Sequence, residues 1–195
     1  MMKRIFDVFF GVLGLIILSP VLLFLAIIIK LNSKGSVFFI QERIGKDGKV
    51  FRIIKFRTMF VLNSINSTIS FKGDPRVTPV GVFLRKYKLD ELPELLNVVL
   101  GTMSLVGPRP DVAGYADKLV GDDRKILRLR PGITGPASLK YSNEEVILAK
   151  QVDPKTYNDE VIYPDKVRIN LDYLNNQSIW LDIKIIFATI FRISY

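Results

Sequence analysis

The N-terminal segment restricts the fold more than any other part of the chain. Residues Ile5 to Ile29 read IFDVFFGVLGLIILSPVLLFLAIII, and Asp7 is the only charged residue among them. A helix of this length rises about 1.5 Å per residue and could cross a hydrocarbon core about 30 Å thick. The run is too long for the apolar part of a cleaved signal peptide, and no small-x-small cleavage site follows it. We therefore expect a membrane-embedded segment.

Two features of this segment argue against a simple spanning helix. Ser19 and Pro20 lie in its middle, and a proline there removes the amide that would bond to the carbonyl of Ile16, so we expect a kink. The Ser19 hydroxyl could bond to the freed carbonyl. Basic residues flank both ends of the run, namely Lys3, Arg4, Lys30 and Lys34. Because such residues favour the cytoplasmic face, a re-entrant helix-break-helix hairpin satisfies both features, with a kinked spanning helix and a buried core helix as alternatives.

Composition narrows the chemistry that the rest of the chain can perform. The 195 residues include no cysteine and no histidine, which excludes thiol nucleophiles, imidazole bases, Cys/His metal sites and disulfides. Oxygen ligands would favour a hard ion such as Mg²⁺. The net charge of +9 fits nucleic acid, anionic lipid or phosphate-bearing substrates, but a chain with 49% hydrophobic residues is too apolar for an ordinary soluble nucleic-acid binder.

The remaining pattern predicts one mostly helical α+β domain. Two strand-like stretches, residues 37–45 and 50–59, flank the turn sequence KDGK and predict a β-hairpin. A long polar loop is expected at Asn63–Pro79. Helices are expected at about 80–87, 92–100, 112–119, 122–129, 144–150 and 164–174.

The last segment, SIWLDIKIIFATIFRI, has a broad apolar helical face. That face comprises Ile179, Trp180, Ile183, Ile186, Phe187 and Ile190, with Asp182, Lys184 and Arg192 off it. Ordinary core packing explains the pattern, and an in-plane interfacial helix with a tryptophan anchor is the alternative.

The sequence KLDELPELL places Asp90 and Glu91 side by side, just before a predicted helix. Aspartate is a favoured helix N-cap, and Pro93 is tolerated in a first turn, so capping alone could explain the pair. A carboxylate at a helix N-terminus can also attack phosphorus while its neighbour holds a metal ion. The pair alone does not decide between these interpretations.

Two further motifs place arginine in rigid turns. In SLVGPRPD, Pro108 and Pro110 restrict the backbone on either side of Arg109, which suits bidentate phosphate contact. In RLRPGITG, Arg130 precedes a Pro-Gly turn. Lys55 and Arg57, among other bases of the predicted hairpin, either form a solvated face near anionic lipid or bind phosphate. An arginine paired with an acid is the structural alternative for Arg109.

Six motifs in one order resemble the bacterial sugar transferase family, the monotopic phosphoglycosyl transferases that act on polyprenol phosphate. They are KRIFDV…SP (Lys3 to Pro20), QERIG (Gln41 to Gly45), KFRTM (Lys55 to Met59), LDELPEL (Leu89 to Leu95), MSLVGPRP (Met103 to Pro110) and RPGITG (Arg130 to Gly135). The resemblance covers nearly the whole chain. There is no Walker P-loop and no dinucleotide-binding glycine pattern.

The resemblance implies an activity. Such enzymes transfer a sugar-1-phosphate from a UDP-sugar to undecaprenyl phosphate and release UMP, the first membrane step of glycoconjugate synthesis. By resemblance, Asp90 is the nucleophile that forms a covalent phosphosugar intermediate, and Glu91 binds Mg²⁺. The loop of Pro108, Arg109 and Pro110 would contact nucleotide or phosphate, and Arg130 another phosphate.

The resemblance also implies a place in the cell. The segment 1–34 would be a re-entrant helix broken at Ser19-Pro20, forming one unit with a catalytic domain, residues 35–195, on the cytoplasmic face of the bacterial plasma membrane. Amphipathic surface helices would surround the active site. Some members carry an additional N-terminal membrane bundle, whereas this chain would be a member with the catalytic module alone.

Parts of the chain depart from the family pattern. PASLKYSNEE (Pro136 to Glu145) replaces a Trp-Ala-Gln continuation, so the resemblance does not identify which sugar is transferred. Glu94 adds a third carboxylate, and its role is open. The oligomeric state is open, with a homodimer as one possibility. A basic membrane-anchored scaffold without activity is the main alternative function. A membrane-tethered nucleic-acid binder would rest on net charge alone.

Overall fold

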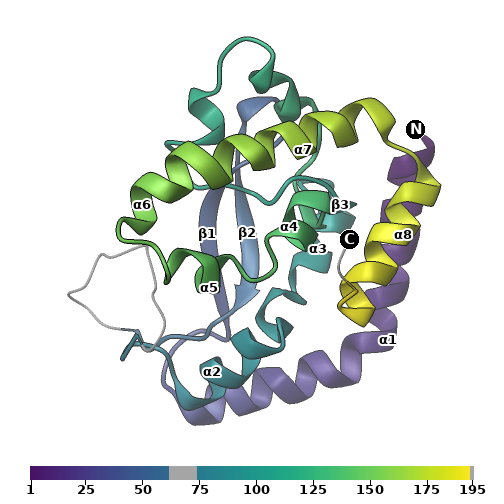
Figure 1. Cartoon of the computed structure of the whole chain (residues 1–195). Helices are drawn as coiled ribbons and strands as arrows, with labels where there is room; N and C mark the ends of the chain where they lie inside the picture. The colour runs from purple at the N-terminus through teal and green to yellow at the C-terminus, as the bar shows by residue number, and fades with distance from the viewer. Residues whose placement is uncertain (62–73, 194–195) are drawn as a thin grey trace.

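The computed structural model describes residues 1–61 and 74–193. Most of the loop predicted at Asn63–Pro79, residues 62–73, lies outside these ranges. The first element is one long helix, α1 (Met2–Asn32), which bends so that its two arms run along different sides of the domain (Figure 1).

The bend of α1 does not break the helix. Pro20 lies inside it, and Ser19 Oγ donates to the carbonyl oxygen of Ile16 at 2.8 Å, the carbonyl that proline leaves without an amide partner. This local hydrogen bond confirms the expected role of Ser19 and allows the helix to continue. The helix-break-helix hairpin is therefore not confirmed, because α1 is a single bent helix.

Both arms of α1 are attached to the same domain. In the N-terminal arm, Arg4 donates to the carbonyls of Val98 and Val99 at 2.6 and 2.9 Å. In the C-terminal arm, Leu25 and Ile29 pack in one hydrophobic cluster with residues of the hairpin and the next helix. Both ends of α1 are therefore fixed to the same domain.

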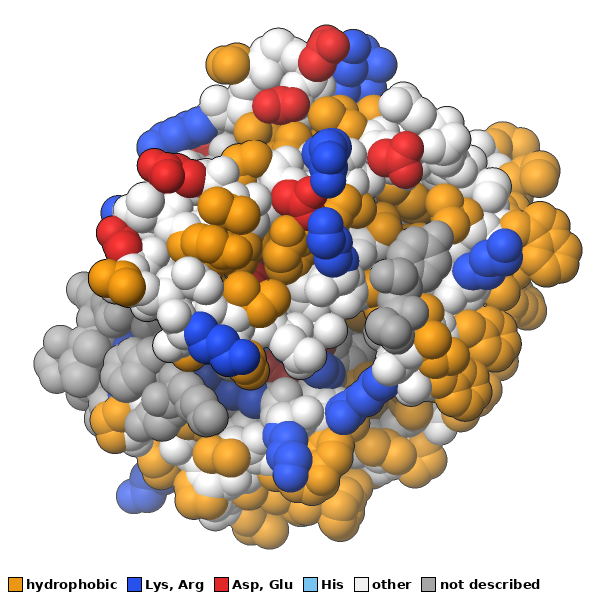
Figure 2. Space-filling model, viewed as in Figure 1, with side chains coloured by type: hydrophobic (Ala, Val, Ile, Leu, Met, Phe, Trp, Pro, Cys, Tyr) orange, Lys and Arg blue, Asp and Glu red, His pale blue; other side chains and the backbone are white. Residues whose placement is uncertain are grey.

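Most of the α1 surface is apolar and exposed. α1 is the one helix in residues 1–61 and 74–193 that is long and apolar enough to cross a membrane, and only 11% of its most apolar window is buried. A core helix of a water-soluble domain would be largely covered. Figure 2 shows hydrophobic side chains gathered along the lower and right edges of this face, where α1, α2 (Pro79–Lys86) and α8 (Ile179–Phe191) lie in Figure 1.

Helix α8 turns a different face inward from the one that core packing predicts. Asp182, Ile185 and Ala188 are buried, while Trp180 and Ile190 are 76% and 67% exposed. Ordinary core packing of the broad apolar face is therefore wrong for these two residues. Asp182 is bonded to Lys3 and to the buried Tyr173 hydroxyl, so its side of the helix faces the domain.

The predicted hairpin is confirmed. Strands β1 (Phe38–Ile44) and β2 (Val50–Phe56) pair antiparallel, with Gln41 opposite Ile53. The turn η1 (Lys46–Gly48) has positive φ angles of 58° at Asp47 and 75° at Gly48, which suits the Asp-Gly sequence.

The predicted helices are only partly confirmed. Helices appear near the expected places as α2, α3 (Glu94–Leu100), α5 (Glu144–Leu148) and α7 (Tyr163–Asn176). The expectations for 112–119 and 122–129 are wrong, since only the short 3₁₀ turns η3 (Ala116–Lys118) and η4 (Asp123–Arg128) form there. The remaining short elements are η2 (Leu89–Glu91), α4 (Pro136–Lys140), α6 (Pro154–Tyr157) and the π-helical turn η5 (Asn158–Ile162).

The sequence did not predict a parallel strand pair that joins two of its motifs. Strand β3 (Ser104–Val106) lies beside β4 (Gly132–Thr134), so the GPRP and RPGITG segments are neighbours. A Cβ atom at Gly107 would lie 2.2 Å from the carbonyl oxygen of Arg130, and one at Gly132 would lie 2.1 Å from the amide nitrogen of Gly107. These glycines are therefore required by close backbone contact.

Candidate active site

The adjacent acids Asp90 and Glu91 lie in the turn η2, between α2 and α3. Lys88 precedes them in the left-handed conformation, with φ 58°, and reverses the chain direction. α3 begins at Glu94 with Pro93 at its N-cap, and no side-chain cap is formed there or at η2. Asp90 Oδ1 is instead buried without a hydrogen-bond partner among the described residues. The capping interpretation therefore does not account for Asp90.

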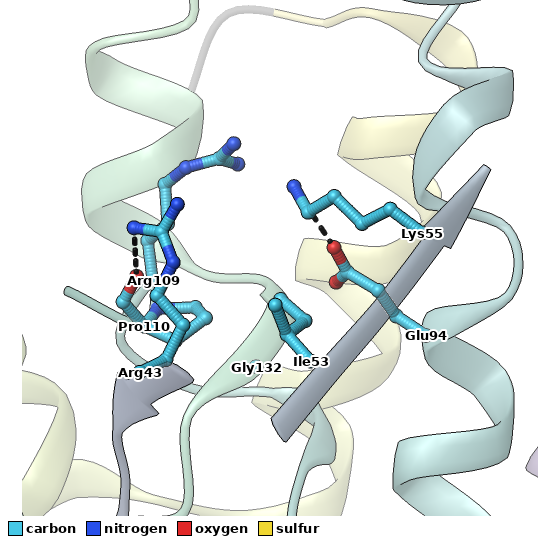
Figure 3. A pocket seen from close by; sticks show the side chains of 7 residues that line it. All are labelled: Arg43, Ile53, Lys55, Glu94, Arg109, Pro110 and Gly132. Atoms are coloured by element: carbon cyan, nitrogen blue, oxygen red, sulfur yellow. Dashed lines mark hydrogen bonds and ion pairs between the residues drawn. The ribbon is translucent and has the colours of Figure 1, made fainter. Parts of the chain in front are cut away.

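Glu91 is the centre of a buried charge cluster. Its Oε1 accepts from Lys55 Nζ at 2.8 Å and from Arg109 Nη2 at 2.6 Å. Lys55 also contacts Glu94 Oε1 at 3.1 Å. Figure 3 shows Lys55 and Glu94 on one side of a pocket and Arg109 on the other. Residues from β2, η2, α3 and the loop after β3 thus meet at one point.

Asn97, which the sequence analysis did not single out, bonds to the backbone of β2 just before Lys55. Its side chain is 1% exposed, accepts from the amide of Ile54 at 2.9 Å and donates to the carbonyl of Arg52 at 2.7 Å. These bonds attach the outer edge of β2 to α3. The sequence could have indicated Asn97, because an asparagine inside an apolar helix needs hydrogen-bond partners when its carboxamide is buried.

The carboxyl groups of the cluster differ in their electrostatic environments. Burial, together with the charge of Glu91, raises the pKa of Asp90. Burial also disfavours the charge of Glu91, but Arg109 and Lys55 outweigh it and lower the pKa of Glu91. Burial raises the pKa of Glu94 to about 7, although Lys55 opposes this shift. The two cations therefore keep Glu91 ionised, whereas the surroundings of Glu94 favour its protonated form.

The loop that carries Arg109 also contributes residues beyond the predicted ones. The carbonyl of Pro110 accepts from Arg43 at 3.3 Å, and Asp111 Oδ2 accepts from the Tyr163 hydroxyl at 3.2 Å. Burial raises the pKa of Asp111 to about 6. Arg43 belongs to the QERIG motif, so strand register could have indicated it, but nothing in the sequence brings Tyr163 to this loop.

Two predicted substrate-binding arginines lie outside the cluster. Arg57 donates to the carbonyls of Ser33 and Lys34, each at 2.7 Å, and so fixes the end of α1. Arg130 donates through Nε to the carbonyl of Gly101 at 3.0 Å, beyond the end of α3. Both guanidinium groups bond to backbone carbonyls, and Arg57 also lines the large cleft described below.

A large cleft joins the acid cluster to the apolar helices. Asp90, Glu91, Arg109 and Pro108 line it, and so do apolar residues of α1 and α8. The apolar lining includes Phe6, Phe10, Leu18, Ile183, Ile186 and Phe187. Lys and Arg side chains surround the hollow in the middle of the face in Figure 2. One continuous space therefore offers both a charged region and an apolar region.

The acids also provide oxygen donors for a divalent cation. The contacts of Lys55 and Arg109 both use Oε1 of Glu91, and Oδ1 of the adjacent Asp90 has no partner within the described part of the chain. No group of three metal-ligating side chains occurs in residues 1–61 and 74–193. Mg²⁺ commonly takes one or two carboxylates together with substrate phosphates, so this donor set fits that ion.

The family model described as bacterial sugar transferase matches residues 1–194. The chain belongs to the bacterial sugar transferase family. The relatives agree with this assignment. The UDP-glucose:undecaprenyl-phosphate glucose-1-phosphate transferase of Escherichia coli (strain K12) is 38% identical over 196 residues, which cover 98% of this chain and 40% of the relative.

Other relatives differ in length and in the sugar that their names give. The exopolysaccharide production protein PSS of Rhizobium leguminosarum bv. phaseoli is 37% identical, and the match covers 97% of this chain and 93% of that protein. The UDP-N-acetylgalactosamine-undecaprenyl-phosphate N-acetylgalactosaminephosphotransferase of Aeromonas hydrophila is 38% identical, with 96% and 42% covered. The chain spans about two fifths of the length of the first curated relatives that it matches.

Proposed function

We propose that this protein transfers a sugar-1-phosphate from a UDP-sugar to undecaprenyl phosphate and releases UMP. The observation that carries the proposal is the cleft, which runs from the apolar residues of α1 and α8 to Asp90, Glu91 and Arg109. A lipid phosphate needs an apolar path for its tail beside a charged site for its headgroup. The names of the relatives supply the substrate class, a nucleotide-linked sugar and undecaprenyl phosphate.

We propose Asp90 as the nucleophile. Its carboxylate oxygen would attack the phosphorus bonded to the sugar, and the bond from that phosphorus to the UMP oxygen would break. An oxygen of the acceptor phosphate would then attack the same phosphorus, releasing Asp90 and forming the lipid diphosphate sugar. Asp90 forms no ion pair within the described residues, which supports this role, because a carboxylate held in ion pairs is a weaker nucleophile.

The neighbouring residues would bind and orient the phosphates. Arg109 is 49% exposed toward the cleft, so its guanidinium can contact a substrate phosphate while Glu91 holds it in place. Lys55 would add a second positive charge. Glu91 and Asp90 would hold Mg²⁺, which, when bound, neutralises phosphate charge. The prolines on either side of Arg109 restrict its backbone.

We also propose that α1 enters and leaves the membrane from the cytoplasmic face. Its basic ends, the attachment of both arms to one domain and the exposed apolar surface between them support this topology. The exposed Trp180 on α8 supports a second contact at the membrane interface. The nucleotide donor would then approach from the cytoplasm.

The test is a product assay on the purified full chain with undecaprenyl phosphate, Mg²⁺ and a panel of UDP-sugars. We expect release of UMP with one or more of the UDP-sugars. Without the acceptor, we expect UMP release to stop after a single turnover. Release of UDP would indicate plain glycosyl transfer and contradict the mechanism. Absence of any product across the panel, with intact lipid binding, would favour a scaffold.

A further inference from the structure

Arg43 is a cation of the site that carries no assigned role. In β1 it lies opposite Phe51, while Gln41 lies opposite Ile53 and Lys55 opposite Phe39. Directly opposed residues of an antiparallel pair share a face of the sheet, so Gln41, Arg43 and Lys55 project from one face. Arg43, Lys55 and Arg109 line the same pocket, and Figure 3 shows Arg43 beside Arg109, across from Lys55.

The contacts of Arg43 hold its guanidinium without neutralising its charge. Nη2 donates to Gln41 Oε1 at 2.6 Å and Nη1 donates to the carbonyl of Pro110 at 3.3 Å. Both acceptors are uncharged. Nε is buried and has no hydrogen-bond partner in residues 1–61 and 74–193, and no carboxylate there forms an ion pair with Arg43.

Two guanidinium groups lie together at this pocket and repel each other, although the carboxylates of Asp111, Glu94 and Glu91 also act on Arg43. Glu91 is the ion-pair partner of Arg109, and Arg43 has none within the described ranges. Burial, and next the charge of Arg109, lower the pKa of Arg43, while the charges of Asp111, Glu94 and Glu91 oppose this shift. An anion in the pocket would remove that repulsion and could use the fork geometry of both arginines.

We propose that Arg43 binds a phosphate of the nucleotide half of the donor, the half that leaves as UMP. This inference rests on the proposed function and adds a residue and a substrate position to it. The second source of the same chemistry is the phosphate of the lipid acceptor. The position of Arg43 along the hairpin, relative to α1, favours binding of the donor phosphate over the acceptor phosphate.

The C-terminal arm of α1 packs against Phe56, next to Lys55, at the end of β2. The backbone of Arg43 pairs with Phe51, four positions along the strand from Lys55, or about 13 Å at about 3.3 Å per residue. Its side chain therefore reaches the shared pocket from the end of the hairpin far from Phe56. A phosphate on a membrane-held lipid stays near the membrane arm. A soluble donor can extend further along the hairpin, where Arg43 lies.

The experiment compares Arg43→Gln, Arg43→Lys and the matched control Arg52→Gln in the full chain, in lipid nanodiscs. Arg52 is exposed and lies on the opposite face of the same hairpin, so its variant removes one positive charge without altering the pocket. The readouts are KM for the UDP-sugar, KM for undecaprenyl phosphate, and Kd for UMP by calorimetry, which needs no turnover. Thermal unfolding checks folding.

We expect Arg43→Gln to raise the donor KM and the UMP Kd about ten- to a hundredfold, the loss of a charge-assisted hydrogen bond. Arg43→Lys should give a smaller rise, and Arg52→Gln and the acceptor KM should change less than about twofold. If Arg43→Gln does not fold, Arg43→Lys tests the proposal instead, because lysine keeps the positive charge but lacks the paired N–H donors of the guanidinium group.

Other outcomes overturn the proposal. A rise of the acceptor KM alone would assign Arg43 to the lipid phosphate instead. Unchanged donor KM and UMP Kd in an active enzyme would remove Arg43 from binding and leave the proposed function intact. A wild-type protein that neither binds UMP nor releases it would overturn the proposed function itself.

Discussion

In the described part of the chain, an anchor cluster and an active-site cluster both hold buried carboxylates, and they differ in how completely their charges are matched. In the anchor cluster, Asp182 is fully buried, and its two oxygens are bonded to Lys3 and to the hydroxyl of Tyr173. In the active-site cluster, Asp90, Glu91 and Glu94 face two paired cations, and Asp90 Oδ1 has no partner among the described residues.

The difference separates a structural task from a chemical one. The anchor cluster joins the start of α1 to the α7–α8 corner, and Asp7 adds a hydrogen bond from the amide of Leu105 at 3.1 Å. A matched polar cluster stabilises one arrangement of its elements, whereas a cluster with unmatched groups is incomplete until a ligand arrives. Mutations in the two clusters should therefore fail in different ways.

The largest expected effect is the loss of turnover in Asp90→Asn. The change keeps the shape of the side chain and removes the attacking charge, so we expect kcat to fall more than about a thousandfold. The thermal midpoint should stay within a few degrees, because no hydrogen bond to Oδ1 is lost. Product assay and thermal unfolding of the same preparation measure both. Substantial residual activity would remove Asp90 from the nucleophile role.

The matched change in the anchor cluster, Asp182→Asn, should do the reverse. It leaves the charge of Lys3 without its partner, and breaking a buried pair costs about 3–5 kcal/mol. We expect the thermal midpoint to fall by about 10 °C, while kcat of the folded enzyme changes little. Loss of kcat at full stability would show that the two clusters are not separable.

A substitution at Asn97 should combine the effects of Asp90→Asn and Asp182→Asn, lowering both kcat and stability. Asn97→Ala leaves the amide of Ile54 and the carbonyl of Arg52 without their partners, at about 1–3 kcal/mol for each unpaired group. Because β2 then loses its attachment to α3, we expect both a lower midpoint and a lower kcat. Thr102→Val removes the two hydrogen bonds between the threonine hydroxyl and Asn97 but leaves both bonds of the Asn97 side chain to β2, so it is the control. An unchanged kcat in Asn97→Ala would show that Lys55 is positioned without it.

The smallest expected effect is a pH dependence of stability at Glu94. Its pKa is about 7 in the folded protein against 4.5 as the ordinary value, so the native state binds more protons than the unfolded state between these values. This contribution to stability is present below about pH 4.5 and is lost as pH rises to about 7. Glu94→Gln should remove that loss, so the variant gains stability relative to wild type between pH 5 and pH 8. Unfolding midpoints of wild type and Glu94→Gln across this range measure the effect. A difference between the two midpoints that does not vary with pH would contradict the raised pKa.

The sequence predicted local elements better than their partners. The hairpin followed from the Asp-Gly turn and the β-branched strands, and the bend of α1 followed from Pro20 and the hydroxyl of Ser19. The parallel pair of β3 and β4 could not be predicted in this way, because three-residue strands carry no periodic pattern. The inward face of α8 could not be predicted, because Asp182 lies off the apolar face and its partner Lys3 is 179 positions away in the sequence.

The same reasoning applies to the site. Asp90, Glu91 and Arg109 stood in short motifs with recognisable chemistry, and the structure brings them together. Arg57 and Arg130 have the same residue type in similar motifs, yet their guanidinium groups bond to backbone carbonyls. Sequence could not separate the two uses of arginine, since the distinction depends on which acceptors the fold places nearby.

The measurement that tests the central claim most directly is UMP release by the enzyme with UDP-sugar and Mg²⁺ in the absence of any lipid acceptor, followed by intact-protein mass spectrometry. The account predicts one UMP per enzyme molecule and a mass increase equal to one sugar phosphate, both absent in Asp90→Asn and both present in folded Asp182→Asn. UMP release that requires the acceptor from the first turnover, or a mass increase that persists in Asp90→Asn, would contradict it.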